Sequence, residues 1–349
     1  METDMKPKKI AFCITCMNRL NHLQQTLEKN IQDNYLPEEV EFILLDYNSK
    51  DGLGQWVYQN MQYHINSGIL VYYKTFVPEN YLRSHSRNMA FRLANADILC
   101  NLDADNFLGK GFAEYMLQEF SKHNNIFYTS NFSFSDIYGR ICVKNRDFNS
   151  INGYNEKMKG WGYEDNDFQN RLVSYGLKPM RFHNPEFYRF VSHSDEDRIS
   201  DELMFKNALK MYIAYINPCT SDILLLNKDF SAEKYTLIDN SLNETKNTLI
   251  EGDVLQGTWQ EKFDSISIRV NGVIYNVEKD ASTFDLQGHT FYKIQDNEFH
   301  TKLILSLSDS VNYRESCIQI NENSEINPDG FGKGTVFKNF DMSKEITLS

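Results

Sequence analysis

Four short apolar runs alternate with three segments of helical apolar spacing over the first hundred residues, and this alternation constrains the fold most strongly. A strand–helix–strand rhythm predicts an α/β fold, with a mostly parallel sheet and helices on both faces. Ligands bind such sheets beyond the carboxyl ends of the strands. The expected strands are 10–14, 40–45, 69–74 and 98–102, and the expected helices are 18–34, 53–63 and 84–95.

The last of these strands ends in two carboxylates. Asp103 and Asp105 are two residues apart, so in an extended segment both side chains point the same way. Two carboxylates on one side repel each other unless a cation lies between them, and Mg²⁺ or Mn²⁺ with oxygen ligands is a common solution that also recruits phosphates. The alternative is an Asp-rich turn that caps the strand.

Two adjacent acids, Glu164 and Asp165, open a predicted helix further along the chain. Carboxylates in the first turn interact favourably with the helix dipole, which is a purely structural reason for them. That reason does not explain the two glycines on either side of Trp161. The glycines give a flexible backbone, and the tryptophan adds one flat surface suited to stacking on a sugar ring. Residues 187–192 then predict a strand that leads to His193, although a lone histidine is often a solvated surface group.

Composition changes near Asn217-Pro218, after a helix expected around 202–215. We therefore predict two domains, 1–218 and a smaller β-rich domain at 219–349. The clearest hairpin covers 265–277, because apolar residues alternate on both sides of Asn271-Gly272. Residues 219–349 contain no set of residues typical of a catalytic site. Three roles are left open for them, namely binding an acceptor, mediating oligomerisation or shielding the catalytic domain. Further strands are expected at 289–294, 301–307 and 315–320.

Charge and hydropathy exclude several classes of protein. The net charge of −12 argues against binding duplex nucleic acid, which needs a basic surface. No apolar run reaches the ~18 residues of a membrane span, and residues 1–9 are polar, so we expect a cytoplasmic protein. Cys13 and Cys16 form a C-x-x-C pattern, but without a second pair they are interpreted as small packing residues.

Taken together, the motifs resemble the GT-A glycosyltransferases, specifically family 2-type enzymes with a galactosyltransferase-like second half. Residues 16–23 are similar to the N-R-x-x-H-L opening of β-1,4-galactosyltransferases, and 46–51 resemble the D-D-G-S-x-D segment of family 2. Residues 83–88 resemble the R-x-x-x-R-N that precedes the D-x-D motif, here 103–105. Residues 160–172 are close to the G-W-G-x-E-D-x-D-x-x-x-R-L of galactosyltransferases and bacterial chondroitin polymerases, with Tyr163 where galactosyltransferases have a second glycine.

The resemblance implies a role for each matched residue. Asp165 would be the catalytic base, and Glu164 is the alternative candidate for that role. Glu164, Trp161 and Gly162 would also bind the acceptor or donor sugar. The implied metal ligands for Mn²⁺ (or Mg²⁺) are Asp103, Asp105 and His193, with His183 a weaker candidate. The implied nucleotide-binding residues are Thr15, Arg19, Asp46 (on the uracil), Arg83, Arg87 and Asp103.

These roles imply an inverting, metal-dependent transfer of a hexose or N-acetylhexosamine from a UDP-sugar to a glycan or glycoconjugate hydroxyl, in the biosynthesis of a bacterial-type surface polysaccharide. Retaining relatives have Asn after the Glu, and an amide cannot act as a base, so Glu164-Asp165 favours inversion. Two alternatives differ in class. A nucleotidyltransferase also pairs an α/β sheet with metal-binding carboxylates, but residues 13–22 lack the glycines of a phosphate loop. The other is a glycan-binding protein with an inactive transferase domain.

Overall fold

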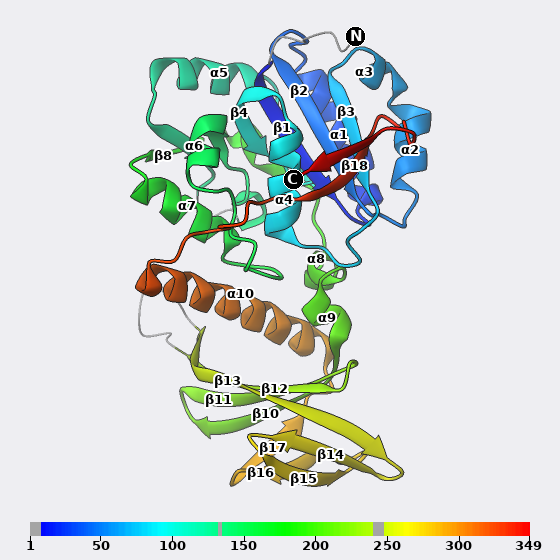
Figure 1. The fold of residues 1–349 in the computed structure, drawn as a ribbon, viewed down its shortest axis with the longest axis vertical. Coiled ribbons are helices and arrows are strands. Elements are labelled where there is room, and N and C mark those ends of the chain that lie inside the picture. The colour runs from blue at the N-terminus through cyan, green and yellow to red at the C-terminus, as the bar shows by residue number, and fades with distance from the viewer. Residues whose placement is uncertain (1–7, 132–134, 240–247) are drawn as a thin grey trace. The chain divides into compact units, whose positions relative to one another are not determined.

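The computed structural model describes residues 8–131, 135–239 and 248–349. The chain forms two compact units (Figure 1). Unit 1 comprises Met1–Lys159, Glu164–His193 and Glu322–Ser349, and unit 2 comprises Gly160–Tyr163 and Ser194–Asn321. The short segment Gly160–Tyr163 therefore belongs to a different unit from the residues on either side of it.

Unit 1 is built on a nine-stranded sheet of order β19-β18-β3-β2-β1-β4-β7-β6-β8. Its centre is parallel, because β1 pairs with β2 and with β4 in parallel register, and β2 pairs likewise with β3. The strands of this unit are β1 (Lys8–Cys16), β2 (Val40–Tyr47), β3 (Leu70–Thr75), β4 (Ala96–Asn101), β5 (Asn106–Phe107), β6 (Ile126–Thr129), β7 (Cys142–Lys144), β8 (Lys178–Arg181), β9 (Arg189–Phe190), β18 (Gly334–Lys338) and β19 (Glu345–Leu348).

Helices cover both faces of this sheet, so the central strands are apolar on both sides, and every residue of β2 is buried. Leu23, Leu27 and Ile31 of α1 pack on one face, and Phe91 of α4 and Phe168 of α7 pack on the other. The predicted fold class, a mostly parallel sheet with helices on both faces, is confirmed. The helices are α1 (Leu20–Asp33), α2 (Leu53–Asn60), α3 (Gln62–Asn66), α4 (Arg83–Leu93), α5 (Phe112–Lys122), η1 (Ser135–Ile137), α6 (Asn145–Ser150), α7 (Glu164–Ser174) and η2 (Pro185–Tyr188).

The C-terminal segment returns to unit 1. Strand β18 pairs antiparallel with β3, with Phe337 opposite Lys74, and Val336 is fully buried in the core. Residues 322–349 thus belong with the parallel sheet, whereas β10 pairs with β11 in the sheet of unit 2. The structure divides the chain differently from the predicted 1–218 and 219–349, because 194–218 belong to unit 2 and 322–349 belong to unit 1. Pairing between strands that are far apart in the sequence leaves no signal in the composition.

Unit 2 contains an eight-stranded antiparallel sheet of order β15-β14-β13-β12-β11-β10-β17-β16, so the predicted β-rich second part is confirmed. In the predicted hairpin, Val270 pairs with Val273, and Asn271 and Gly272 have φ of 51° and 77°, as a two-residue type I′ turn requires. The elements are α8 (Asp195–Ile199), α9 (Leu203–Asn207), β10 (Ala208–Asn217), β11 (Thr220–Asn227), β12 (Ser231–Asp239), β13 (Thr248–Lys262), β14 (Ser265–Val270), β15 (Val273–Glu278), β16 (Thr283–Leu286), β17 (His289–Lys293) and α10 (Asn297–Glu322).

Four secondary-structure predictions are wrong, two in part and two throughout. Most of the helix expected at 202–215 is strand β10, whose register with β11 buries Met211 to Ala214. The strands expected at 301–307 and 315–320 are both parts of the long helix α10. The strand expected at 187–192 is shorter, because η2 occupies its first residues and β9 contains only Arg189–Phe190.

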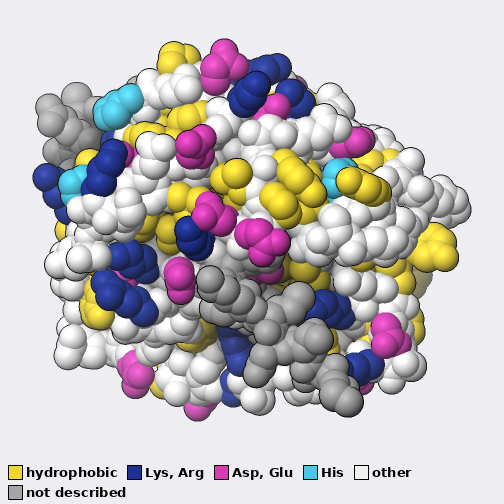
Figure 2. All heavy atoms as spheres, turned by 90° about the horizontal axis from the view of Figure 1, so that it is seen from above, with side chains coloured by type: hydrophobic (Ala, Val, Ile, Leu, Met, Phe, Trp, Pro, Cys, Tyr) yellow, Lys and Arg dark blue, Asp and Glu magenta, His cyan; other side chains and the backbone are white. Residues whose placement is uncertain are grey.

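Among the described residues, no helix is both long and apolar enough to span a membrane. On the face seen in Figure 2, basic and acidic side chains of the described residues are interspersed, and they form no broad basic area.

Candidate functional site

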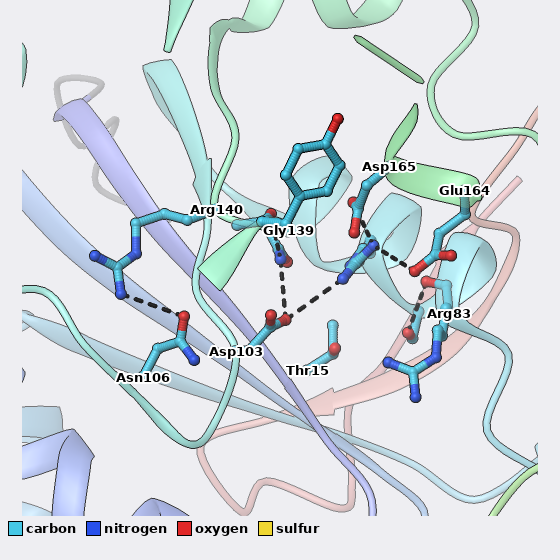
Figure 3. Close-up of polar contacts among 12 residues, drawn as sticks. Thr15, Arg83, Asp103, Asn106, Gly139, Arg140, Glu164 and Asp165 are labelled. Atoms are coloured by element: carbon cyan, nitrogen blue, oxygen red, sulfur yellow. Dashed lines mark hydrogen bonds and ion pairs between the residues drawn. The ribbon is translucent and has the colours of Figure 1, made fainter. Parts of the chain in front are cut away.

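The candidate site is organised around Arg87, a buried residue of α4. Its Nη1 donates to Asp165 Oδ1 at 2.7 Å and to Glu164 Oε1 at 3.2 Å, and its Nη2 lies 3.5 Å from Asp103 Oδ1 (Figure 3). Burial by itself lowers the pKa of Arg87. The carboxylates of Asp165 and Asp103 raise this pKa by a larger amount, so it lies well above its usual value. One guanidinium therefore joins the acidic end of β4 to the acidic start of α7.

Asp103 follows β4 at the carboxyl end of the sheet. Asn101 Nδ2 donates both to Asp103 Oδ1 at 3.0 Å and to the carbonyl of Gly139 at 3.0 Å, which fixes the carboxylate relative to the strand end. Although burial raises the pKa of Asp103, Arg87 and Asn101 hold it below its usual value. Asp103 therefore stays ionised, as a ligand for a cation must.

These polar groups lie close to the Cα of Gly139. A Cβ at this position would lie 2.9 Å from Arg87 Nη2, 3.0 Å from Asp165 Oδ2 and 3.2 Å from Asp103 Oδ2. These Oδ2 atoms are not the oxygens through which Asp165 and Asp103 contact Arg87, so each carboxylate turns a second oxygen toward Gly139. A residue with a side chain would collide with these groups, so the glycine permits their close approach to the backbone.

Asp165 has the electrostatic character of a general base. Burial raises its pKa to about 7, Glu164 and Asp103 act in the same direction, and Arg87 opposes them. A carboxyl group whose pKa lies near neutral pH can both accept and release a proton at working pH. The neighbouring Glu164 is buried, and its Oε1 contacts Arg87.

The predicted metal ligands Asp105 and His193 are brought together. Asp105 Oδ2 lies 2.8 Å from His193 Nε2, because the backbone N–H of Val191 donates to the Asp105 carbonyl and β5 pairs with β9. A carboxylate oxygen beside an imidazole nitrogen is a donor set that suits Mn²⁺. Within the described residues, no group of three or more His, Cys, Asp or Glu side chains gathers around one point, and Asp103 contacts Arg87 instead. His183 is exposed after β8.

Asp46, at the end of β2, is fully buried and already bonded. Tyr72 OH and Lys74 Nζ contact its Oδ2 at 2.7 and 2.8 Å, and the Ser49 backbone N–H donates to its Oδ1 at 2.8 Å. These contacts organise the loop that follows β2. The predicted contact with uracil stays a prediction.

The remaining predicted nucleotide-binding residues lie at the carboxyl ends of strands or the start of helices. Thr15 Oγ1 and Tyr81 OH are 2.6 Å apart, and the Arg83 guanidinium carbon lies 5.4 Å from the centre of the Tyr81 ring. Arg19 is half-buried and immediately precedes α1. All three are thus placed at the edge of the sheet where ligands of α/β folds bind.

Trp161 and Gly162 belong to unit 2, where they pack on helices α8 and α10. The Arg198 guanidinium lies 5.7 Å from the centre of the Trp161 ring, and Asn312 Nδ2 donates to the Gly162 carbonyl at 2.7 Å. Gly162 has φ of 99°, and a Cβ there would lie 2.6 Å from Asp309 Cβ. Close packing on α10 therefore explains this glycine without a sugar, and the predicted sugar contacts of Trp161 and Gly162 stay a prediction.

Comparison with protein families identifies one part of the chain. Residues 127–194 match the model of the N-terminal domain of galactosyltransferase. This segment is galactosyltransferase-like. It contains Glu164, Asp165 and His193, so the resemblance predicted from residues 160–172 is confirmed there, whereas Asp103 and Asp105 lie outside the matched residues.

No curated protein matches the chain, and the solved structures that resemble it do so distantly. The mannosyltransferase PcManGT from Pyrobaculum calidifontis, in complex with GDP-Man and Mn²⁺, has 15% identity and a TM-score of 0.43 over 52% of this chain and 58% of its own. S. aureus TarS has 13% identity and a TM-score of 0.44 over 54% and 61%. The catalytic domain of Drosophila β1,4-galactosyltransferase 7, in complex with xylobiose, has 15% identity and a TM-score of 0.39 over 56% and 75%.

Sequence reasoning did not find Asn101, Asn106, Gly139 or Arg140 as site residues. Asn101 and Asn106 flank the D-x-D motif, so proximity to Asp103 and Asp105 was a usable signal. Gly139 and Arg140 fall in none of the recognised motifs, and nothing in the sequence around them indicates that they approach β4 and β5. Their contacts arise from tertiary packing.

Proposed function

We propose that the chain is an inverting glycosyltransferase that uses a nucleotide sugar and a divalent metal ion. The observation that carries this proposal is the contact of one buried residue, Arg87, with both Asp103 and Asp165. It brings the strand-end carboxylate of the D-x-D motif together with the acid that opens the helix of the galactosyltransferase-like segment.

In the proposed reaction, Asp165 accepts the proton of an acceptor hydroxyl through Oδ2, the oxygen that does not contact Arg87. Arg87 holds Oδ1 and so fixes the direction of the carboxylate. Attack of the hydroxyl on the side opposite the leaving diphosphate inverts the anomeric carbon. Glu164, buried beside Arg87, would contact a sugar hydroxyl.

Asp105 and His193 would hold the metal ion, with Asp103 nearby as the third predicted ligand. A bound Mn²⁺ or Mg²⁺ neutralises charge on a leaving diphosphate as a Lewis acid. The residues present suit such an ion, because a carboxylate oxygen (Asp105 Oδ2) and an imidazole nitrogen (His193 Nε2) lie 2.8 Å apart, and both are ligand types that Mn²⁺ accepts.

We further propose a UDP-sugar donor, such as UDP-Gal, UDP-GalNAc or UDP-Glc, and a glycan or glycoconjugate acceptor. The support for this is the galactosyltransferase-like segment together with the D-x-D resemblance. GDP-Man is a necessary comparison, since the mannosyltransferase PcManGT was solved with that nucleotide sugar.

The test is a screen of these four nucleotide sugars for release of nucleoside diphosphate, with Mn²⁺ and with chelator. We expect release from at least one UDP-sugar that depends on the metal and is lost in Asp105→Ala. Binding of glycans without any release would favour a glycan-binding protein with an inactive transferase domain. Release of pyrophosphate from a nucleoside triphosphate would favour a nucleotidyltransferase.

A further inference from the structure

Arg140 is the largest fully buried side chain of the described residues, and it lies beside the proposed metal ligands without touching them. Its Nη2 donates to the carbonyl of Phe107 at 2.9 Å and to Asn106 Oδ1 at 3.2 Å, and its Nη1 donates to the carbonyl of Phe187 at 2.5 Å. These three acceptors are neutral. A buried guanidinium held only by neutral acceptors is expensive to desolvate, so its retention calls for an explanation beyond packing.

The three acceptors lie on the two segments that carry Asp105 and lead to His193. Asn106 and Phe107 form β5, which directly follows Asp105, and Phe187 lies in η2, just before β9. Arg140 therefore bridges the backbone of both segments at the place where β5 pairs with β9. Its fork of N–H groups sets the spacing of these two segments in a way that a single-point donor cannot.

Arg140 also fixes the orientation of an amide that contacts Asp105. Asn106 accepts from Arg140 through Oδ1, so its Nδ2 must point the other way, where it donates to Asp105 Oδ1 at 2.8 Å and to the carbonyl of Asp136 at 3.1 Å. With Oδ1 of Asp105 held by this amide, Oδ2 is the oxygen that faces His193 Nε2 (Figure 3 shows the contact of Arg140 with Asn106). If the amide were reversed, its oxygen would oppose the carboxylate.

We propose that Arg140 is the positioning residue of the metal centre, acting through Asn106 to direct Oδ2 of Asp105 toward His193. This inference rests on the proposed metal site. The hydrogen-bond chain Arg140–Asn106–Asp105 is the physical link, and its partners are all in unit 1. Groups that orient a metal ligand typically change metal affinity by about 10- to 100-fold when they are removed.

The experiment measures Mn²⁺ alone, by titrating the protein and following the electron paramagnetic resonance signal of free Mn²⁺. The variants are Arg140→Met, Arg140→Lys, Asn106→Ala and the double variant, with Asp105→Ala as the reference for a lost ligand. Arg146→Lys is the matched control, because its side chain is largely exposed. Circular dichroism establishes that each variant is folded, and Asn106→Ala tests the link even if Arg140→Met does not fold.

We expect Arg140→Met and Asn106→Ala each to lower the affinity for Mn²⁺ by about 10-fold or more. The double variant should bind Mn²⁺ no more weakly than the worse single variant, because both changes break the same chain of hydrogen bonds. Arg140→Lys should restore part of the affinity, and Arg146→Lys should match wild type. Mn²⁺ affinity that is unchanged in folded Arg140→Met, while Asp105→Ala loses it, would overturn the role of Arg140 and leave the metal site intact. Equal affinities in wild type and Asp105→Ala would overturn the proposed metal site and this inference with it.

Discussion

At the scale of single residues, the ionisation of Asp165 sets an expected pH dependence. Burial raises its pKa to about 7, and only the ionised carboxylate can accept a proton. The transfer rate should therefore rise with pH to a plateau above about 7, and it should fall about tenfold per unit below that value. The measurement is kcat/KM between about pH 5 and about pH 9. A flat profile across this range would show that Asp165 does not act as the base.

The close approach of three polar groups to Gly139 gives a second prediction at this scale. An alanine Cβ would lie 2.9 Å from Arg87 Nη2 and 3.0 Å from Asp165 Oδ2, so one of these groups must move. We expect Gly139→Ala to lower transfer by about 10-fold or more, since small displacements of a reacting group are costly. Its melting temperature is measured alongside, so that a loss of the fold is distinguished from a displacement of these groups. Full activity in Gly139→Ala would argue against a reacting centre at this place.

Part of the site could be predicted from sequence, because its residues fall in short local motifs. Asp103 and Asp105 follow β4, at the sheet edge where α/β folds bind ligands, and Glu164 and Asp165 open α7, where the helix dipole favours carboxylates. Arg140 could not be predicted in the same way. Arginine is mostly exposed in proteins, and this one is buried by tertiary contacts with β5, η2 and the Phe112 ring of α5.

At the scale of elements, the strands and helices of the parallel sheet were predictable and helix α10 was not. The predictable elements have apolar residues on a clear period, such as Leu23, Leu27 and Ile31 on α1. Helix α10 instead buries Ser308, Ser310, Asn312 and Ser316 together with its apolar residues. Buried polar residues break the apolar period, so parts of this helix gave the alternation typical of strands.

The sheet of unit 2 contains a buried ion pair that yields a stability prediction for neighbouring strands. Lys234 Nζ of β12 lies 2.5 Å from Asp222 Oδ2 of β11, and Thr236 donates to Asp222 Oδ1 at 2.6 Å. Lys234→Met would leave a buried carboxylate without its counter-charge, and we expect a loss of about 3–5 kcal/mol of unfolding free energy. Lys279→Met, which breaks the exposed pair with Glu261, should change it little. Denaturant unfolding compares the two, and equal effects would contradict the account.

At the scale of the whole molecule, residues 322–349 complete unit 1, because they add β18 and β19 to its sheet. Val336 is buried in its core, and the Gly332 backbone N–H donates to Glu156 Oε1 at 2.6 Å, an oxygen that also accepts from Asn88. A chain of residues 1–218 lacks this segment and leaves β3 as an unpaired edge. We therefore expect it to be insoluble, whereas a chain ending after Ser343 should be soluble because it loses only β19. A soluble 1–218 chain that melts like wild type would contradict this role of the C-terminal segment.

The most direct test of the central claim compares transfer and donor binding in Asp165→Asn. The amide keeps the shape of the side chain and a contact to Arg87, but it cannot accept the proton of an acceptor hydroxyl. With Glu164→Gln as the matched control, both quantities are measured on the same preparations with the donor found by the screen. We predict that transfer falls by about 10²–10⁴ in Asp165→Asn while the donor binds as in wild type. Transfer near the wild-type rate in Asp165→Asn would contradict the claim, and a loss confined to Glu164→Gln would assign the base to Glu164.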